Sequence, residues 1–214
     1  MLKYIEMVFA ALLLFLLVLL FSFVIYLFCK RVIYKLNKRV LARNIAIIKN
    51  SKELASFENL SENEIRERLI IPFFLVLGYN TFDMREFVRT QRRASVEPDY
   101  ITKKWDNSKL CKRSLYIKYE KFADDAVDLK NKVYIDNKMQ GVNIDELMNK
   151  LYFNGEYYVL TNGYLYLFFN KNYVIGSKKF DFCFNVKSFT KSDIARLAYF
   201  AKQYMFLQIS DVYR

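Results

Sequence analysis

An uncharged apolar segment near the N-terminus is the feature that most constrains this chain. The segment Met7–Phe28 contains 22 residues and no charge, proline or glycine. As an α-helix it would span about 33 Å, slightly more than the ~30 Å hydrocarbon layer of a bilayer. We therefore expect residues 1–29 to form a transmembrane anchor. The alternative is a cleavable signal peptide, whose apolar region is shorter and ends at small residues; this run leads instead into Lys30 and Arg31.

The charges on the two sides of this segment predict its orientation. Seven Lys and Arg residues and no acid lie between Lys30 and Asn50, whereas Lys3 and Glu6 before the segment cancel. Because the positive flank stays in the cytoplasm, we expect a single-pass protein of the cell membrane with its N-terminus outside and its C-terminal domain in the cytoplasm. Without those seven charges, +5 of the net charge of +12 remains. Anionic lipid headgroups can account for much of the basicity.

The next segment has the spacing of an amphipathic helix. From Lys30 to about Phe57, apolar residues recur at steps of three and four, which is helical spacing. We expect a basic helical stalk over residues 30–58 whose basic face lies near the lipid; a partner-binding or dimerising helix is the alternative. Residues 59–214 should then form one globular domain, since ~155 residues can bury a single core. A piece that begins near Ser61 is expected to fold by itself.

The pattern within this domain predicts an α/β fold. Ser61 and Glu64 have the spacing of a capping box, and the helix that follows should kink at Pro72 and end at Gly78. Strands are expected at residues 87–96, 100–102, 114–119, 157–160, 164–169 and 180–186, and an Asn-Gly pair at 162–163 predicts a hairpin between the fourth and fifth. Further helices are expected at residues 143–153 and from 190 to about 205, the latter capped by its first residue, a threonine.

Several kinds of chemistry are excluded by composition. The chain has no histidine, which excludes His-based zinc sites and His-containing catalytic triads. Its three cysteines, Cys29, Cys111 and Cys183, show no CxxC spacing, and we expect reduced, buried thiols; acylation of Cys29 at the membrane edge is the alternative. No GxxxxGK[ST] loop and no glycine cluster occurs, so ATP is not expected as a partner.

Three stretches, taken in order, resemble one nuclease family. Residues 61–79 look like an opening helix with a glutamate, a proline ten residues later and a Leu-Gly-Tyr end; residues 96–101 contain a Pro-Asp-Tyr turn; and residues 158–168 contain a Leu-Thr-Asn-Gly hairpin. The set resembles the N-terminal endonuclease domain of type I restriction enzyme R subunits and its stand-alone relatives, in the PD-(D/E)XK nuclease superfamily. The resemblance implies a restriction-endonuclease-like fold, a mixed β-sheet flanked by helices.

The resemblance also implies Mg²⁺-dependent hydrolysis of DNA, here of foreign DNA at the membrane. In the family, a Pro-Asp carboxylate and an acid two residues before a lysine form the site. Carboxylates provide the oxygen ligands that Mg²⁺ prefers, the lysine orients or activates the attacking water, and the metal stabilises charge on the phosphate. Asp99 matches the first carboxylate, and Glu62 matches the carboxylate of the family's opening helix.

The strand that should complete this site departs from the family. It reads Lys118-Tyr119-Glu120, so that acid and lysine are exchanged, although both still share one face of a strand. In one hypothesis the site is rearranged and active, with Asp99 and Glu120 as the metal ligands. In the other, Lys118 repels the metal and pairs with Asp99, which leaves a binding or regulatory pseudonuclease. A simple solvated strand face overlaps with the second hypothesis.

Basic residues near these motifs are candidate nucleic-acid contacts. They are Arg89, Arg92, Arg93, Lys103 and Lys104, for which an ordinary solvated face is the alternative. The leading hypothesis is a membrane-anchored, DNA-binding protein whose nuclease site is either active or degenerate. The rival hypothesis is a non-enzymatic single-pass membrane protein that uses the degenerate fold to bind a protein partner.

Overall fold

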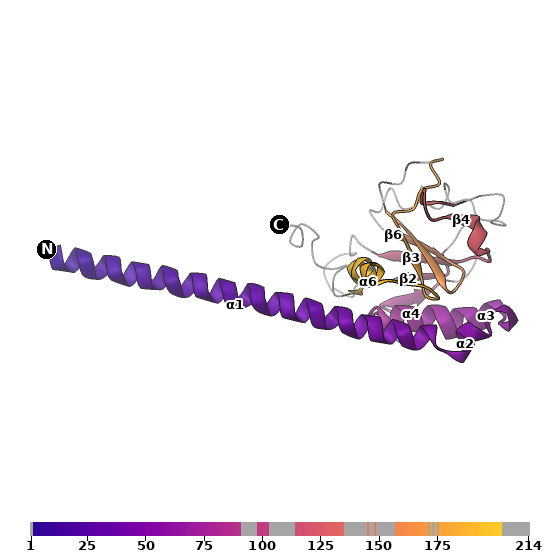
Figure 1. Cartoon of the computed structure of the whole chain (residues 1–214), viewed down its shortest axis with the longest axis horizontal. Helices are drawn as coiled ribbons and strands as arrows, with labels where there is room; N and C mark the ends of the chain where they lie inside the picture. The colour runs from indigo at the N-terminus through magenta and orange to yellow at the C-terminus, as the bar shows by residue number, and fades with distance from the viewer. Residues whose placement is uncertain are drawn as a thin grey trace. The chain divides into compact units, whose positions relative to one another are not determined.

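The structure is a computed structural model that describes residues 2–90, 98–102, 114–134, 145, 148, 157–170, 172, 174 and 176–202, with the side chains of the first helix described at 14–29 and from 37 onward. It consists of two compact units, Met1–Val40 and Leu41–Arg214. A single long helix, α1 (Leu2–Lys49), begins in the first unit and ends in the second (Figure 1). The expected continuation of the apolar helix into the stalk is therefore confirmed.

The described residues of the first unit all belong to α1. Its large apolar side chains from Leu14 to Phe28 are all exposed. Among the residues that the structure describes, no helix is both long enough and apolar enough to cross a membrane.

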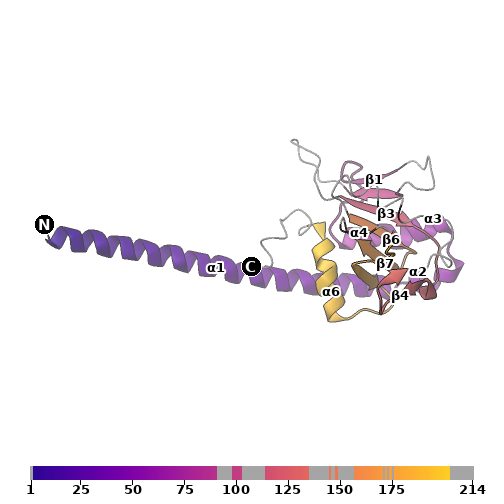
Figure 2. The same ribbon diagram turned by 90° about the horizontal axis from the view of Figure 1, so that it is seen from above.

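A mixed six-stranded sheet forms the centre of the second unit. Its strands, in spatial order, are β1 (Phe87–Arg89), β2 (Tyr100–Thr102), β3 (Leu115–Tyr119), β6 (Tyr157–Thr161), β7 (Leu165–Phe169) and β8 (Phe182–Asn185). Neighbours are antiparallel except β3 and β6, which are parallel; Figure 2 shows β1, β3, β6 and β7 following one another across the sheet. The predicted α/β class with a mixed sheet flanked by helices is confirmed.

A second, small sheet lies outside this order. Strands β4 (Val127–Asp128) and β5 (Val133–Tyr134) form an antiparallel pair, which follows the short 3-10 helix η3 (Asp124–Ala126). Of the helix expected at residues 143–153, the structure describes only Asp145 and Met148, and both are helical. Residues 91–96 of the first expected strand lie outside the described residues.

Local hydrogen bonds define both ends of the opening helix. At the start, the Ser61 hydroxyl accepts from the Glu64 amide and a Glu64 carboxylate oxygen accepts from the Ser61 amide at 3.0 Å, the expected capping box. At the end, Gly78 has φ +90°, and the Tyr79 amide donates to the Phe74 carbonyl at 3.1 Å. This is a Schellman termination, which requires a left-handed residue where glycine stands. Both predicted ends are confirmed.

The middle of the opening helix contains a π turn. The helix consists of α3 (Glu62–Ile65), the π-helical turn η2 (Arg66–Ile70) and α4 (Ile71–Val76). Pro72 has no N–H and its ring clashes with a carbonyl four residues earlier in a regular α-helix. The wider turn before it, in which the Ile71 amide donates to the Arg66 carbonyl, accommodates the proline where a simple kink was expected.

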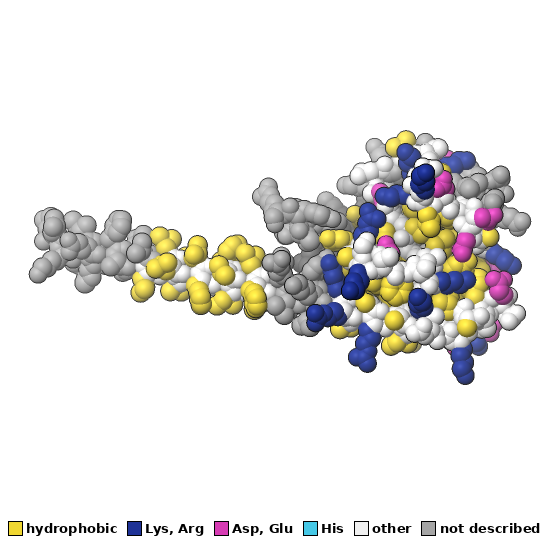
Figure 3. All heavy atoms as spheres, in the orientation of Figure 1, with side chains coloured by type: hydrophobic (Ala, Val, Ile, Leu, Met, Phe, Trp, Pro, Cys, Tyr) yellow, Lys and Arg dark blue, Asp and Glu magenta, His cyan; other side chains and the backbone are white. Residues whose placement is uncertain are grey.

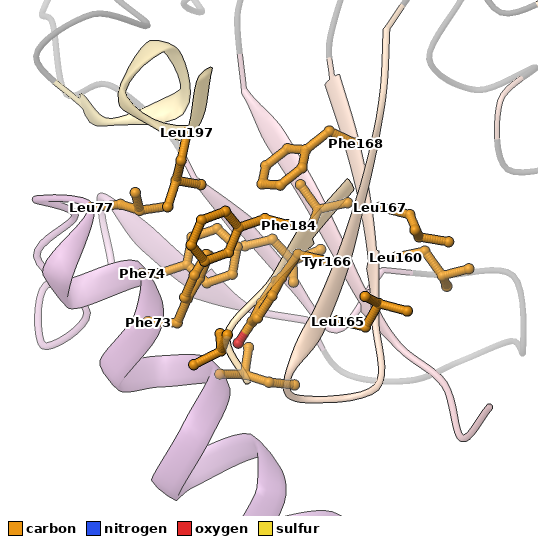
Figure 4. Packing of buried hydrophobic residues seen from close by; sticks show 14 of the residues in the cluster. Phe73, Phe74, Leu77, Leu160, Leu165, Tyr166, Leu167, Phe168, Phe184 and Leu197 are labelled. Carbon is orange, nitrogen blue, oxygen red and sulfur yellow. The ribbon is translucent and has the colours of Figure 1, made fainter. Parts of the chain in front are cut away.

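Aromatic side chains of α4 pack against the sheet. The rings of Phe73 and Tyr166 stack with centroids 3.7 Å apart, and Phe184 lies beside them at 5.9 Å from Phe73. Leu197, from helix α6 (Lys191–Leu197), reaches the same cluster (Figure 4). Burying each such side chain contributes about 1.5–3 kcal/mol, so this face of the sheet holds the opening helix in place.

The second half of the predicted stalk belongs to the globular unit. Helix α1 ends at Lys49, Ser51 caps the short helix α2 (Lys52–Ala55), and the 3-10 helix η1 (Phe57–Asn59) follows. The stalk helix expected over residues 30–58 is therefore interrupted. Four of its apolar side chains are buried in the domain core, namely Leu41, Ile45, Ile48 and Leu54. The apolar stripe of this segment covers the domain, and the boundary expected after residue 58 lies within one packed unit.

The predicted β6–β7 hairpin is confirmed, and its turn contacts the opening helix. Gly163 has φ +104° and is the first central residue of a two-residue turn, which glycine favours. The Asn162 carboxamide oxygen accepts from the Leu165 amide at 2.9 Å. A Cβ at position 163 would lie 2.5 Å from Cγ2 of Ile65. The absence of a side chain therefore allows the helix to approach the turn.

The last helix is interrupted within its expected range. Thr190 and Asp193 form its capping box, as predicted. However, α6 ends at Leu197, the 3-10 helix η5 (Ala198–Phe200) follows, and Ala201 is extended with ψ 143°. The helix expected to continue to about residue 205 is interrupted at Ala201, whereas residue 202 is helical and residues 203–205 lie outside the described residues. Tertiary hydrogen bonds replace the helical ones: the backbone carbonyls of Phe200 and Leu77 accept from the Tyr79 hydroxyl and from the amide of residue 202.

Candidate active site

Asp99 lies beside the strand that carries Lys118. Tyr100 pairs with Ile117 in the antiparallel register of β2 and β3, which places Asp99 opposite Lys118 on the same face of the sheet. The Asp99 amide donates to the Ile117 carbonyl at 2.8 Å. One carboxylate oxygen, Oδ2, accepts from the Tyr119 amide at 2.7 Å. The expected juxtaposition of Asp99 with this strand is confirmed.

Lys118 is buried and forms an ion pair on its own strand. Its side chain is 3% exposed, and its Nζ lies 3.7 Å from Oε1 of Glu120, whose side chain is 23% exposed. The Glu120 amide continues the parallel pairing by donating to the Thr161 carbonyl at 2.9 Å. Because its side chain is buried, Lys118 is not part of a solvated face, and that interpretation is wrong. A lysine this deeply buried needs an anionic partner.

Arg66, from the opening helix, forms an ion pair with Asp99. Its Nη2 lies 3.2 Å from Oδ1 of Asp99 and also forms an ion pair with Glu62. The guanidinium carbon is 5.1 Å from the centroid of the Tyr119 ring. In one hypothesis from the sequence, Lys118 was singled out as a cation for Asp99, whereas Arg66 was not singled out. The spacing of Glu62 and Arg66, four residues apart on a helix, is the signal that could have indicated a paired arginine.

The polar atoms around this cluster are incompletely hydrogen-bonded. Nε and Nη2 of Arg66 lie in the buried interior without a well-aligned hydrogen bond to any described residue, although Nη2 is within ion-pair distance of both carboxylates. The Tyr158 hydroxyl is likewise buried and lacks a hydrogen-bond partner in the described part of the chain. Burial, together with the charges of Asp99 and Glu120, raises the pKa of Tyr158 well above 10. This phenol therefore keeps its proton at neutral pH.

This arrangement does not fit a bound Mg²⁺ ion. One oxygen of Asp99 faces the Arg66 guanidinium, the other accepts a backbone amide, and Glu120 lies beside the Lys118 ammonium. Mg²⁺ requires near-octahedral oxygen ligands, and adjacent cations repel it. Within the residues that the structure covers, no three or more Asp, Glu, Cys or His side chains are grouped so that they could hold a metal ion.

The predicted nucleic-acid contacts fall mostly outside the described residues. Arg89 is exposed at the end of β1, which is an edge strand of the sheet. Residues 92, 93, 103 and 104 are not among those described. Figure 3 shows Lys and Arg side chains distributed over the visible face of the second unit, with apolar side chains between them.

The Cys183 thiol is unsuited to catalysis. Cys183 is a free thiol, and burial is the main reason that its pKa is raised to about 12. A thiol with this pKa stays protonated at neutral pH and is a poor nucleophile. Cys29 is also free but exposed, whereas Cys111 lies outside the described residues. We expected buried thiols, but Cys29 is exposed and Cys183 is half-buried.

Comparisons with known proteins found no relative of this chain. No protein family, no curated protein and no solved structure matches the chain.

Proposed function

We propose that this chain is a membrane-anchored, DNA-binding protein with a restriction-endonuclease-like domain whose cleavage site is degenerate. The family resemblance predicts a helix, a Pro-Asp turn and a charged strand around one site. The opening helix, Asp99 and β3 contribute side chains to one cluster, which supports the proposed fold.

One observation carries the proposal that the site does not cleave. Asp99 and Lys118, at the centre of the cluster, are 5% and 2% exposed as whole residues. Arg66 and Lys118 already supply positive charge to the carboxylates. A hydrolytic site needs a metal and a water molecule beside the scissile phosphate. A buried cluster whose charges are already compensated favours a domain that retains nucleic acid without hydrolysing it.

The DNA-binding part of the proposal rests on the distribution of charge. Outside the stalk the chain keeps a positive excess, and exposed Arg89 begins the run that continues in the sequence with Arg92 and Arg93. Basic side chains bind phosphates by releasing condensed counterions, so that affinity falls steeply as salt rises. The triple substitution of these arginines by alanine should reduce the slope of log K against log salt by about 3, at ~0.9 for each phosphate that the protein no longer neutralises.

This test has a matched control on the same domain. Lys130, Lys179 and Lys191 are also exposed, and their triple replacement by alanine removes the same charge from other surfaces. We expect fluorescence anisotropy of a labelled duplex to show the reduced slope only for the arginine variant. Equal losses in both variants would show nonspecific attraction, and no retention of DNA by the parent chain at low salt would reject the proposal.

The membrane part of the proposal rests on the segment Met7–Phe28. The structure describes its side chains from Leu14 onward, and the large apolar ones among them are exposed. A continuous apolar surface of this kind is rare in water and is typical of membrane contact. The full chain should remain with the membrane fraction after an alkaline carbonate wash. Recovery as soluble protein would contradict the anchor.

A second candidate function is supported by an exposed apolar loop. Phe82 and Met84 are 85% and 86% exposed in the turn between α4 and β1. This loop is held in shape by hydrogen bonds from the Asn80 amide and from Lys202 to the two carboxylate oxygens of Glu86. A rigid loop with two large apolar side chains is suited to a protein partner. If DNA binding fails its test, the partner-binding scaffold is the better proposal.

A further inference from the structure

We propose that the loop of residues 80–86, between α4 and β1, inserts Phe82 and Met84 into the surface of the bilayer that holds the proposed anchor. The inference rests on the membrane part of the proposed function and adds a second, peripheral contact to it. Phe82 and Met84 are 85% and 86% exposed, more than any other large apolar side chain that the structure describes. The side chains that gain most from leaving water therefore lie together on one loop.

Hydrogen bonds hold this loop in a shape that keeps both side chains in solvent. The Asn80 side-chain oxygen accepts from the Phe82 amide at 3.2 Å. The Asp83 carbonyl accepts from the amides of Glu86 and Phe87, each at 2.9 Å. Because a loop that is already ordered loses little conformational entropy on binding, the gain from burying its apolar side chains is largely retained.

The charges of the loop are compensated within the domain. The Asp83 carboxylate accepts two hydrogen bonds from the Arg85 guanidinium, both at 3.0 Å. Glu86 pairs with Nζ of Lys202 at 2.7 Å. Two acids and two bases leave no net charge here, so the loop has little attraction for DNA phosphates and no requirement for anionic lipid. Apolar contact is the interaction that it offers.

The opening helix brings the loop toward the end of the second unit at which α1 enters. The residues of α1 from Leu41 onward belong to this unit. In both Figure 1 and Figure 2, α3 lies near the end of α1, and α4 lies further back along its direction. The opening helix therefore runs back along this part of α1, and the loop that follows α4 lies on the side where the chain enters the unit.

The short tether makes a weak apolar contact sufficient. Residues 29–40 separate the apolar segment from the second unit, a length of about 18 Å as an α-helix. A tether of this kind keeps the domain at an effective concentration on the order of millimolar relative to the bilayer. Half burial of two large apolar side chains favours contact about ten- to a hundredfold. This is too weak to capture a free domain from solution, but it suffices for a tethered one.

A protein partner is the other occupant that this loop could take. Specific interfaces bury about 800 Å² on each partner, whereas a phenylalanine side chain supplies only about 150–250 Å². The side chains that alternate with the two apolar ones, Thr81, Asp83 and Arg85, are polar. Insertion of a few apolar side chains at a bilayer surface requires no such area. The bilayer is therefore the better match.

Tryptophan reporters in the full chain, reconstituted in phosphatidylcholine nanodiscs, test this contact. The variants are Phe82→Trp and Met84→Trp. The matched control is Leu129→Trp, because Leu129 is also a large apolar residue, 58% exposed, between β4 and β5. Trp105 is the single tryptophan of the chain, so the emission of the parent chain is subtracted. Lipid brominated in its upper acyl chains quenches inserted side chains, and acrylamide quenches those in water.

We expect brominated lipid to quench the emission from positions 82 and 84 but not from position 129, since an inserted side chain lies about 5–10 Å into the boundary of headgroups and acyl chains. Acrylamide should quench positions 82 and 84 severalfold less than position 129. Because the loop has no net charge, neither result should change at high salt. Near-ultraviolet circular dichroism verifies that each variant is folded, and either reporter alone decides the outcome.

Two results would overturn the inference. One is quenching of positions 82 and 84 by acrylamide alone, as at position 129, which places the loop in water. The other is shielding of both positions from both quenchers, which indicates protein contact. A chain that does not co-elute with nanodiscs refutes the proposed anchor and, with it, this inference. A chain that co-elutes but shows either of the two results refutes this inference alone, so the two failures are distinguishable.

Discussion

Replacing Gly163 by alanine tests the packing on which the candidate site depends. Gly163 has φ +104°, and a Cβ there would meet Cγ2 of Ile65 at 2.5 Å. A left-handed conformation costs an alanine about 1–2 kcal/mol, and overpacking against a core side chain adds about 1–3 kcal/mol. We expect Gly163→Ala to lower the free energy of unfolding by about 3 kcal/mol or more.

Gly176 provides the matched control for this substitution. It has φ +78°, and a Cβ there would meet no atom within 4 Å, so Gly176→Ala includes the backbone strain without the clash. We expect Gly176→Ala to lower the free energy of unfolding by about 1–2 kcal/mol. For a chain of this size, 1 kcal/mol lowers Tm by about 2–4 °C, so Gly163→Ala should unfold at least about 2 °C below Gly176→Ala.

Thermal unfolding of the full chain in detergent, followed by near-ultraviolet circular dichroism, measures this difference. The tyrosines of the sheet report on the second unit, and the apolar part of α1 contributes little to their signal. If Gly163→Ala unfolds at the same temperature as Gly176→Ala, the opening helix does not approach the hairpin turn as described. The positions of Ile65 and of the adjacent Arg66 would then need revision.

Three further predictions concern single features of the fold. Lys118→Ala should lower the free energy of unfolding by about 3–5 kcal/mol, because it leaves Glu120 without its buried cation. Lys121→Ala, at the exposed neighbouring position, should lower it by less than about 0.5 kcal/mol; urea unfolding measures both. A thiol-alkylating reagent at neutral pH should label exposed Cys29 and leave Cys183 unlabelled until the chain is unfolded; mass spectrometry detects the labels. Rapid labelling of both thiols would contradict the burial that raises the pKa of Cys183 to about 12. A piece that begins at Ser61 should fail to fold, because it lacks the four buried apolar side chains of α1 and α2. Burial of each contributes about 1.5–3 kcal/mol, whereas the total stability of a domain is typically about 5–15 kcal/mol. Cooperative melting of that piece would refute this prediction.

Features with a local cause were predictable from the sequence. A capping box involves residues three apart, so Ser61 and Thr190 were identifiable as helix starts without knowledge of the fold. The hairpin around Gly163 follows from the conformational freedom of glycine between two apolar segments. A mixed sheet flanked by helices was also expected, and the structure contains one.

Features with a tertiary cause were not predictable in this way. Helical spacing in residues 30–58 indicates an apolar stripe but not what covers it, so the burial of Leu41 and Ile45 in the domain core was missed. The end of α6 depends on hydrogen bonds to residues of the opening helix. Arg66 lies in the π turn of the opening helix and meets Asp99 just before β2, and no local pattern specifies that a cation from this helix will reach Asp99.

The most direct test of the account is cleavage of supercoiled plasmid by the full chain and by its Asp99→Asn variant, with Mg²⁺ and with Mn²⁺ present. The proposed closed site predicts that the parent chain retains the plasmid at low salt and releases it intact when salt is raised, with no more nicked product than the variant gives. Nicked or linear plasmid that forms only with a divalent ion, and that disappears with Asp99→Asn, would contradict the account and establish an active nuclease.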